Sequence, residues 1–180
     1  MKRTVLGLVI LAATPGILAT PVRADDMEKV ANSFYATYVG LPRAGGIPDA
    51  TARVRYAPLL SPRLGRLIVD AAAAEIRFSK QNKNAPPLIE GDLFSSLFEG
   101  FTQFKVGACS GDAKTGQCSI NLTYQDKKSL KPVSWNDTLL LVNTPSGWKV
   151  DDLAYKAGFQ FGNTGLLSDT LKMAISEAPP

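Results

Sequence analysis

Residues 118–125 read CSINLTYQ and alternate between apolar and polar side chains. Successive side chains of a β-strand point to opposite faces, so the alternation predicts a strand with one buried face. Further strands are predicted at residues 104–110, 134–143 and 148–155, which are separated by turn-forming or Lys/Pro-rich links. Four consecutive strands with short links predict an antiparallel meander.

The chain before this meander has helical patterning instead. Apolar side chains recur every three or four positions over residues 27–38, and Ser61-Pro62 is a typical start for a second helix that runs to about Lys80. Shorter elements are a helical turn at 50–56, a short helix or extended segment at 93–98, and a closing helix at 166–175. Helices followed by strands predict an α+β domain, with N-terminal helices packed on a curved antiparallel sheet of about four strands.

The first 24 residues have the pattern of a cleavable secretory signal. Lys2 and Arg3 precede an apolar run that is too short and too broken to remain as a membrane-spanning helix. Residues 22–24, Val-Arg-Ala, place small side chains where a signal peptidase reads them, so we expect cleavage after Ala24. The alternative is an amphipathic or buried N-terminal helix. Export predicts a soluble periplasmic or secreted protein that contacts a membrane only in transit, with residues 25–180 as one domain.

Charge and composition bear on the class of partner. Removing residues 1–24 lowers the 20 Lys and Arg residues to 17 against 16 Asp and Glu residues, so the net charge falls from +4 to +1. The longest basic cluster in the remainder is Lys127-Lys128. A chain of this kind is a poor match for a phosphate backbone, so we expect no nucleic-acid partner.

Cys109 and Cys118 are the only cysteines, and they flank a segment rich in turn-forming residues. A turn between two strands brings the thiols opposite one another, which predicts a disulfide across a hairpin in an oxidising compartment. A redox dithiol is the alternative, but the pair lacks Cys-x-x-Cys spacing.

The absence of histidine limits the chemistry available to this chain. Ser-His-Asp and Cys-His hydrolases need an imidazole, and most zinc sites need imidazoles or several thiolates, so neither class of site is expected. Residues 158–165 are rich in glycine but lack the Gly-Lys-Ser/Thr ending of a phosphate loop, which favours a flexible lead into the last helix. No cofactor or metal is predicted.

The remaining candidates for a site are phenol, indole and carboxylate groups. Trp148 and Asp152 lie on one strand face by period two, which would place the carboxylate in a cavity beside Tyr38 and Trp135. An acid there could bind a ligand or accept a proton. The structural alternative is that Asp152 bends the strand ladder or caps a neighbouring backbone, and that Tyr38 belongs to the core.

Three stretches carry a resemblance to a known family: residues 34–38, 56–60 and 147–153. They resemble exported bacterial domains of unknown function that are similar to the cystatin-like, nuclear-transport-factor-2-like cone. The neighbours of that family include immunity proteins that inhibit type VI secreted amidases. The likeness covers most of residues 27–175.

The resemblance implies an exported binding protein or inhibitor that performs no catalysis, with an unknown protein or a small apolar molecule as its ligand. A small-molecule carrier is the first alternative, and a histidine-free isomerase or hydrolase is the second. Whether the protein forms a homodimer stays an open question at this point.

Overall fold

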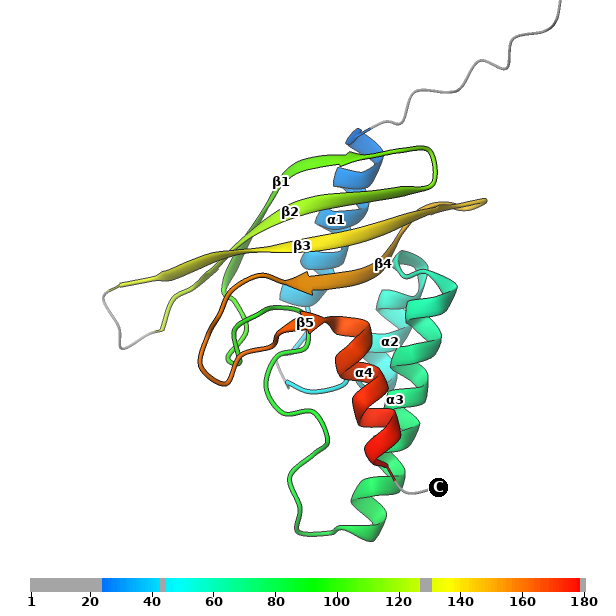
Figure 1. Ribbon diagram of the computed structural model, residues 1–180, viewed down its shortest axis with the longest axis vertical. Coiled ribbons are helices and arrows are strands. Elements are labelled where there is room, and N and C mark those ends of the chain that lie inside the picture. Colours follow the sequence, from blue (N-terminus) through cyan, green and yellow to red (C-terminus); the bar gives the residue numbers. More distant parts are fainter. Residues whose placement is uncertain (1–23, 43–44, 127–130, 179–180) are drawn as a thin grey trace, which may run out of the picture.

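The computed structural model of the chain describes residues 24–42, 45–126 and 131–178 (Figure 1). The predicted secretory signal lies outside the described residues, except for Ala24. The helical elements are α1 (Ala24–Val39), α2 (Ala50–Tyr56), the 3-10 turn η1 (Ala57–Leu59), α3 (Pro62–Gln81) and α4 (Leu167–Glu177). The strands are β1 (Gln103–Gly111), β2 (Thr115–Tyr124), β3 (Val133–Thr144), β4 (Gly147–Tyr155) and β5 (Gly165–Leu166).

The strands form one open antiparallel sheet in the order β1-β2-β3-β4-β5. This confirms the predicted meander of four strands and adds β5, which pairs with Ala154 and Tyr155 at the end of β4. Two residues are too few to show a period-two pattern, which explains why the sequence did not predict β5. Gly165 has φ +73°, a backbone conformation that favours glycine, at the point where β5 leads into α4.

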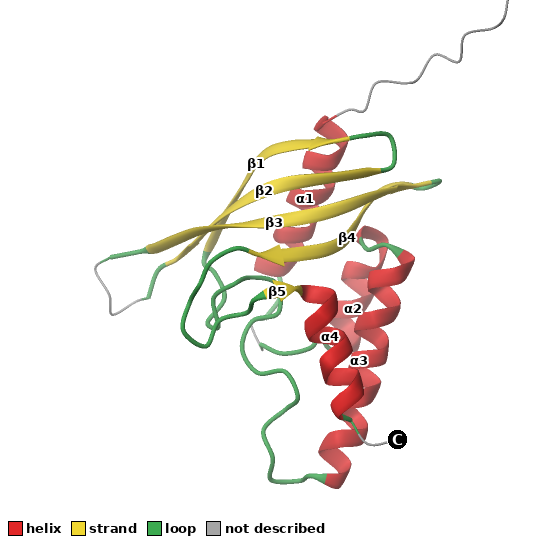
Figure 2. Ribbon diagram, in the orientation of Figure 1, coloured by secondary structure: helices red, strands yellow, loops and turns green. Residues whose placement is uncertain are grey.

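Figure 2 shows how the helices lie against the sheet. α1 crosses one face and contacts β1, β2 and β4, while α3 and α4 pack side by side and extend away from the β4–β5 side. The predicted α+β class, with N-terminal helices packed on an antiparallel sheet, is therefore confirmed.

Local capping fixes the starts of two helices. The Ser61 side chain accepts a hydrogen bond from the Leu64 N–H at 3.0 Å, and Pro62 opens α3, as predicted. The Asp49 side chain accepts from the Ala52 N–H at 2.7 Å, which caps the short helix α2. These caps satisfy N–H groups that have no partner within the helix.

The core lies between α1 and the sheet and continues under residues 92–101. Phe34 of α1 packs edge-on to Tyr35 and Phe94, with ring centroids 5.2 and 5.1 Å apart. Tyr38 stacks on Phe101 at 4.2 Å. Aromatic side chains bury large apolar areas, so this cluster joins the irregular segment to α1.

The predicted disulfide between Cys109 and Cys118 is confirmed. The two residues lie opposite each other in β1 and β2, with Cα atoms 4.1 Å apart. One step along, the register shifts between Val106 and Cys109, so that Gly107 and Ala108 together oppose Ser119. This β-bulge bends the edge strand beside the disulfide.

Residues 93–98 form neither the predicted short helix nor a strand, but a series of bends and turns. The Asp92 N–H donates to the Phe98 carbonyl at 2.8 Å, and the Asn163 side chain donates to the Asp92 and Ser95 carbonyls at 2.6 and 2.8 Å. The Asp92 and Ser95 carbonyls, which could otherwise accept in a helix or a ladder, therefore bond to a side chain instead. Asn163 also belongs to the glycine-rich lead into the last helix, so that lead is tied to residues 92–96 at this point.

Candidate functional site

Asp152, the predicted acid of the site, does not share a face with Trp148. Leu141 lies opposite Val150, whereas Leu140 lies opposite Asp152, so the ladder contains one extra residue at Asp151. This bulge reverses the alternation and turns Asp152 to the other face of the sheet. The prediction that placed Asp152 with Trp148 is therefore wrong, because strict period two does not hold across a bulge.

The contacts of Asp152 are those of a cap, which was the structural alternative. The residue is 4% exposed, and one carboxylate oxygen accepts hydrogen bonds from the Leu153 and Ser168 N–H groups at 2.9 and 3.0 Å. Ser168 lies in the first turn of α4, whose own N-cap residue makes no side-chain cap. Asp152 thus supplies, from β4, the acceptor and negative charge that a helix N-terminus requires.

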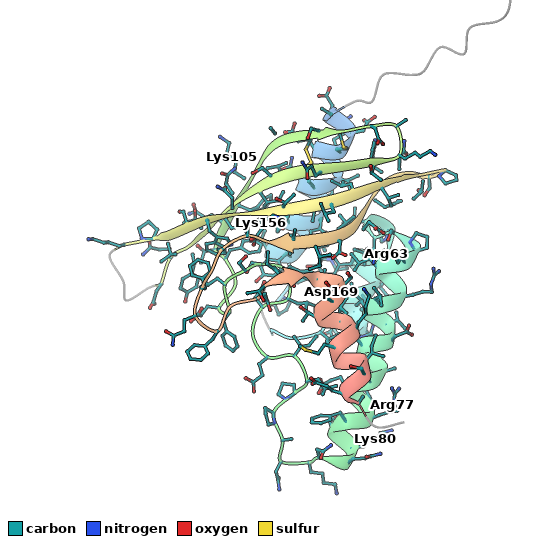
Figure 3. All side chains as sticks on the ribbon, in the orientation of Figure 1. Arg63, Arg77, Lys80, Lys105, Lys156 and Asp169 are labelled. Carbon is teal, nitrogen blue, oxygen red and sulfur yellow. A yellow bond between two sulfur atoms is a disulfide. The ribbon has the colours of Figure 1, made fainter. Side chains whose placement is uncertain are left out.

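Arg63 lies in the first turn of α3, at the end of that helix nearest β4 (Figure 3), and connects Asp152 to it. Its guanidinium bonds both carboxylates, at 2.9 Å to Asp151 and 3.2 Å to Asp152. Burial raises the pKa of Asp151, but the hydrogen bonds from Arg63 and Ser61 outweigh it, so the net shift is downward. The hydrogen bond with Asp151 in turn raises the pKa of Arg63. The cluster holds α3, β4 and α4 together, which is a structural task.

Trp135 also has a structural partner. Its indole N–H donates to Asp137 at 3.0 Å, and its ring packs edge-on to Phe159 at 5.3 Å. Asp137 is 0% exposed and accepts from the N–H groups of Ser96 and Lys156, at 2.8 and 2.9 Å, and from the Ser96 hydroxyl. A carboxylate with this many donors is stabilised without water. Sequence reasoning missed Asp137, although its place two residues after Trp135 was a signal for an inward-facing acid.

Tyr38 lies at a different place, next to an acid that the sequence did not single out. Its hydroxyl donates to one oxygen of Asp92, and the other oxygen accepts from the Phe94 N–H at 2.8 Å. Asp92 is 7% exposed. Gly100, at φ +77°, lies against this pair, and a Cβ at that position would overlap the Tyr38 hydroxyl. Glycine therefore meets both the backbone and the space requirement of the Tyr38–Asp92 pair.

A cavity of about 310 Å³ opens beside the Tyr38–Asp92 pair. We call it the first cavity. It lies between the end of α1, the segment before α2, and α2 itself, and its lining includes Tyr38, Tyr56, Asp92 and Phe94. Neither Trp135 nor Asp152 is among its lining residues, so the structure does not join the three predicted residues in one cavity. Roughly 300–1,000 Å³ is the usual range for small-ligand pockets.

The electrostatics of the first cavity favour hydrogen bonding over proton transfer. Burial, together with the charge of Asp92, raises the pKa of Tyr56 far above its ordinary value, against a small opposing effect of Arg55. The phenol stays protonated at neutral pH. Both oxygens of Asp92 already accept hydrogen bonds, which is a poor starting state for a general base.

Among the described residues, 24–42, 45–126 and 131–178, there is no group of three or more His, Cys, Asp or Glu side chains placed to hold a metal ion. None of the helices in the same ranges combines the length and the apolar character needed to cross a bilayer.

Comparison with known proteins adds no family to this description. The chain matches no protein-family model and no curated protein. The predicted likeness to exported cone-shaped domains therefore stays a prediction.

Proposed function

We propose that this protein is an exported binding protein that holds a small, largely apolar molecule in the first cavity without transforming it. The observation that supports the proposal is the cavity itself, with its aromatic walls and a hydrogen-bonded acid and phenol at one side. A concave apolar site with a few fixed polar groups is the usual form of a small-molecule site.

Tyr56 carries the polar group best placed to determine which ligand the first cavity binds. Its hydroxyl forms no hydrogen bond with another described residue, although the residue is almost fully buried and lines the cavity. Its pKa is raised, so the hydroxyl is available as a neutral donor or acceptor. Phe94, whose ring lies 5.1 Å from that of Tyr56, offers an aromatic surface next to it. We expect a ligand with an aromatic or aliphatic body and one neutral polar group.

Saturation-transfer NMR with p-cresol and indole as probes tests this proposal. The wild-type chain should bind at least one of them, and Thr51→Trp, which places a large ring on an exposed lining residue, should remove the signal. Ser79→Trp, an exposed position on α3 outside the cavity, is the matched control and should bind normally. Equal signals from the two Trp variants would contradict the proposal.

Export is tested separately, by expressing the chain with residues 1–24 in a Gram-negative host. The periplasmic fraction should contain a species whose intact mass corresponds to Asp25–Pro180, with both cysteines oxidised. A cytoplasmic full-length product with reduced cysteines would contradict export. The disulfide supports the extracytoplasmic location, because such bonds persist in oxidising compartments.

One observation favours inhibition of another protein as a second candidate function. Phe161, in the link between β4 and β5, is 83% exposed and has φ +62°. A bulky residue in this backbone region is strained, and exposed aromatic rings are typical anchors of protein interfaces. A photo-crosslinking residue at position 161, in cells that export the chain, should give a discrete adduct that the same residue at the exposed Val54 does not give. Identical adducts from both positions would argue against this candidate.

A further inference from the structure

A second cavity, of about 430 Å³, lies between α2, η1 and the first half of α3. Its walls are mainly apolar and include Leu60, Ile68 and Val69. Tyr56 and Pro48 line both cavities, so they stand between the two. The second cavity differs from the first in the charge of its lining.

The charged side chains that line the second cavity are both arginines, Arg53 and Arg66. No carboxylate lines it, and the ion pairs found within the described residues involve neither arginine. Arg53 is half-buried and donates one hydrogen bond, to the Pro48 carbonyl at 2.8 Å. Arg66 is exposed. Two cations without an acidic partner, at an apolar cavity, create a local preference for an anion.

Gly65 leaves one wall of this cavity open. It lies inside α3, where glycine is among the least favourable residues for a helix. A Cβ built at this position meets no heavy atom within 4 Å. A larger side chain could therefore occupy the space without displacing the protein, so Gly65 keeps the cavity available for a ligand.

We propose that the second cavity binds an anionic amphiphile with a single hydrocarbon chain, a medium-chain carboxylate being the simplest example. The guanidinium groups of Arg53 and Arg66 receive the carboxylate, since their planar N–H donors match its two oxygens. The hydrocarbon chain lies against Tyr56, Leu60 and Ile68, where it leaves water. The site shares the wall residue Tyr56 with the first cavity, but it goes beyond the function proposed there, because it depends on two arginines that do not line the first cavity.

Isothermal titration calorimetry with decanoate, below its micelle-forming concentration, tests the site. Decanoate should bind at a stoichiometry of about one, at least tenfold more tightly than decanol or decyltrimethylammonium, because arginine pairs with an anionic head group. The double variant Arg53→Gln/Arg66→Gln should weaken decanoate binding at least tenfold. Lys80→Gln/Lys83→Gln is the charge-matched control, because it removes two exposed positive charges at and just beyond the far end of α3 (Figure 3), and it should stay within twofold of wild type.

Gly65→Leu separates loss of the site from loss of the fold. The added side chain enters open space, so the variant should melt at or above the wild-type temperature while losing decanoate binding. It should keep p-cresol binding in the first cavity, which distinguishes failure of this site from failure of the proposed function. Equal affinity for decanol, or undiminished decanoate binding by either the Gly65→Leu or the double arginine variant, would overturn the proposal.

Discussion

The β1–β2 hairpin and residues 92–98 are held in place by opposite means. In the hairpin, neighbouring strands pair along the chain and the Cys109–Cys118 disulfide spans only 9 positions. Residues 92–98 form no regular element, and the distant side chains of Asp137 and Asn163 bond to their backbone. The first region follows local patterns, whereas the second depends on single polar side chains far away in the sequence. Such side chains should therefore be the most sensitive positions of the fold.

Replacement of Asp137 gives the largest expected effect. Asp137→Ala leaves the buried donors of Ser96, Trp135 and Lys156 without their acceptor. Each such donor costs about 1–3 kcal/mol, so we expect the free energy of unfolding to fall by about 4 kcal/mol. Urea denaturation measures the change. Asp70 is exposed, so the control Asp70→Ala should change the free energy of unfolding by close to zero. A loss below about 1 kcal/mol would mean that water replaces the carboxylate.

Removal of the disulfide should have a smaller effect. Cys109→Ala/Cys118→Ala is expected to lower the free energy of unfolding by about 2–3 kcal/mol, because the bond restricts the unfolded chain over a short loop. Chemical denaturation of the reduced wild-type protein should give a similar value. If the free energy of unfolding fell more in the double cysteine variant than in Asp137→Ala, the order proposed for the two regions would be reversed.

Tyr35 offers a test in which stability should rise. Its hydroxyl is fully buried and has no hydrogen-bond partner among the described residues, and burial, together with Asp137 and Asp92, raises its pKa. Tyr35→Phe should increase the free energy of unfolding by about 1 kcal/mol, because it removes an unsatisfied polar group. Tyr155→Phe is the matched control. That hydroxyl donates to the Leu93 carbonyl at 2.8 Å, so its loss should cost about 1 kcal/mol.

The smallest effect concerns the half-exposed carboxylate of Asp151. Its folded-state pKa is lowered, so its contribution to stability is present above the unfolded value of about 3.9 and is lost as the pH falls through the folded value. Arg63→Gln removes the main partner. The stability difference between wild type and Arg63→Gln should therefore shrink as the pH falls below about 4. A difference that stayed constant in thermal melts down to pH 2 would contradict this linkage.

Regular elements could be predicted because their signals are local. Period two in residues 118–125 and helical spacing in residues 62–80 report burial on one face, and the structure confirms both. The disulfide followed from two cysteines around a turn. Each of these inferences uses residues only a few positions apart.

The candidate site could not be predicted in the same way. One bulge at Asp151 was enough to move Asp152 to the other face, and period two contains no sign of a bulge. Asp92 could be recognised as the partner of Tyr38 only once the chain had folded, because 54 positions separate them. Tyr38 itself lines the first cavity as well as packing in the core.

The bulge in β1 has a consequence for self-association of the protein. β1 is an outer strand of an open sheet, and a flat outer strand offers backbone donors and acceptors to any passing strand. Between Val106 and Cys109 that regular row is interrupted, and the exposed Lys105 adds a charge directly before it. Fibrillar growth along this border should therefore be disfavoured even in concentrated solution.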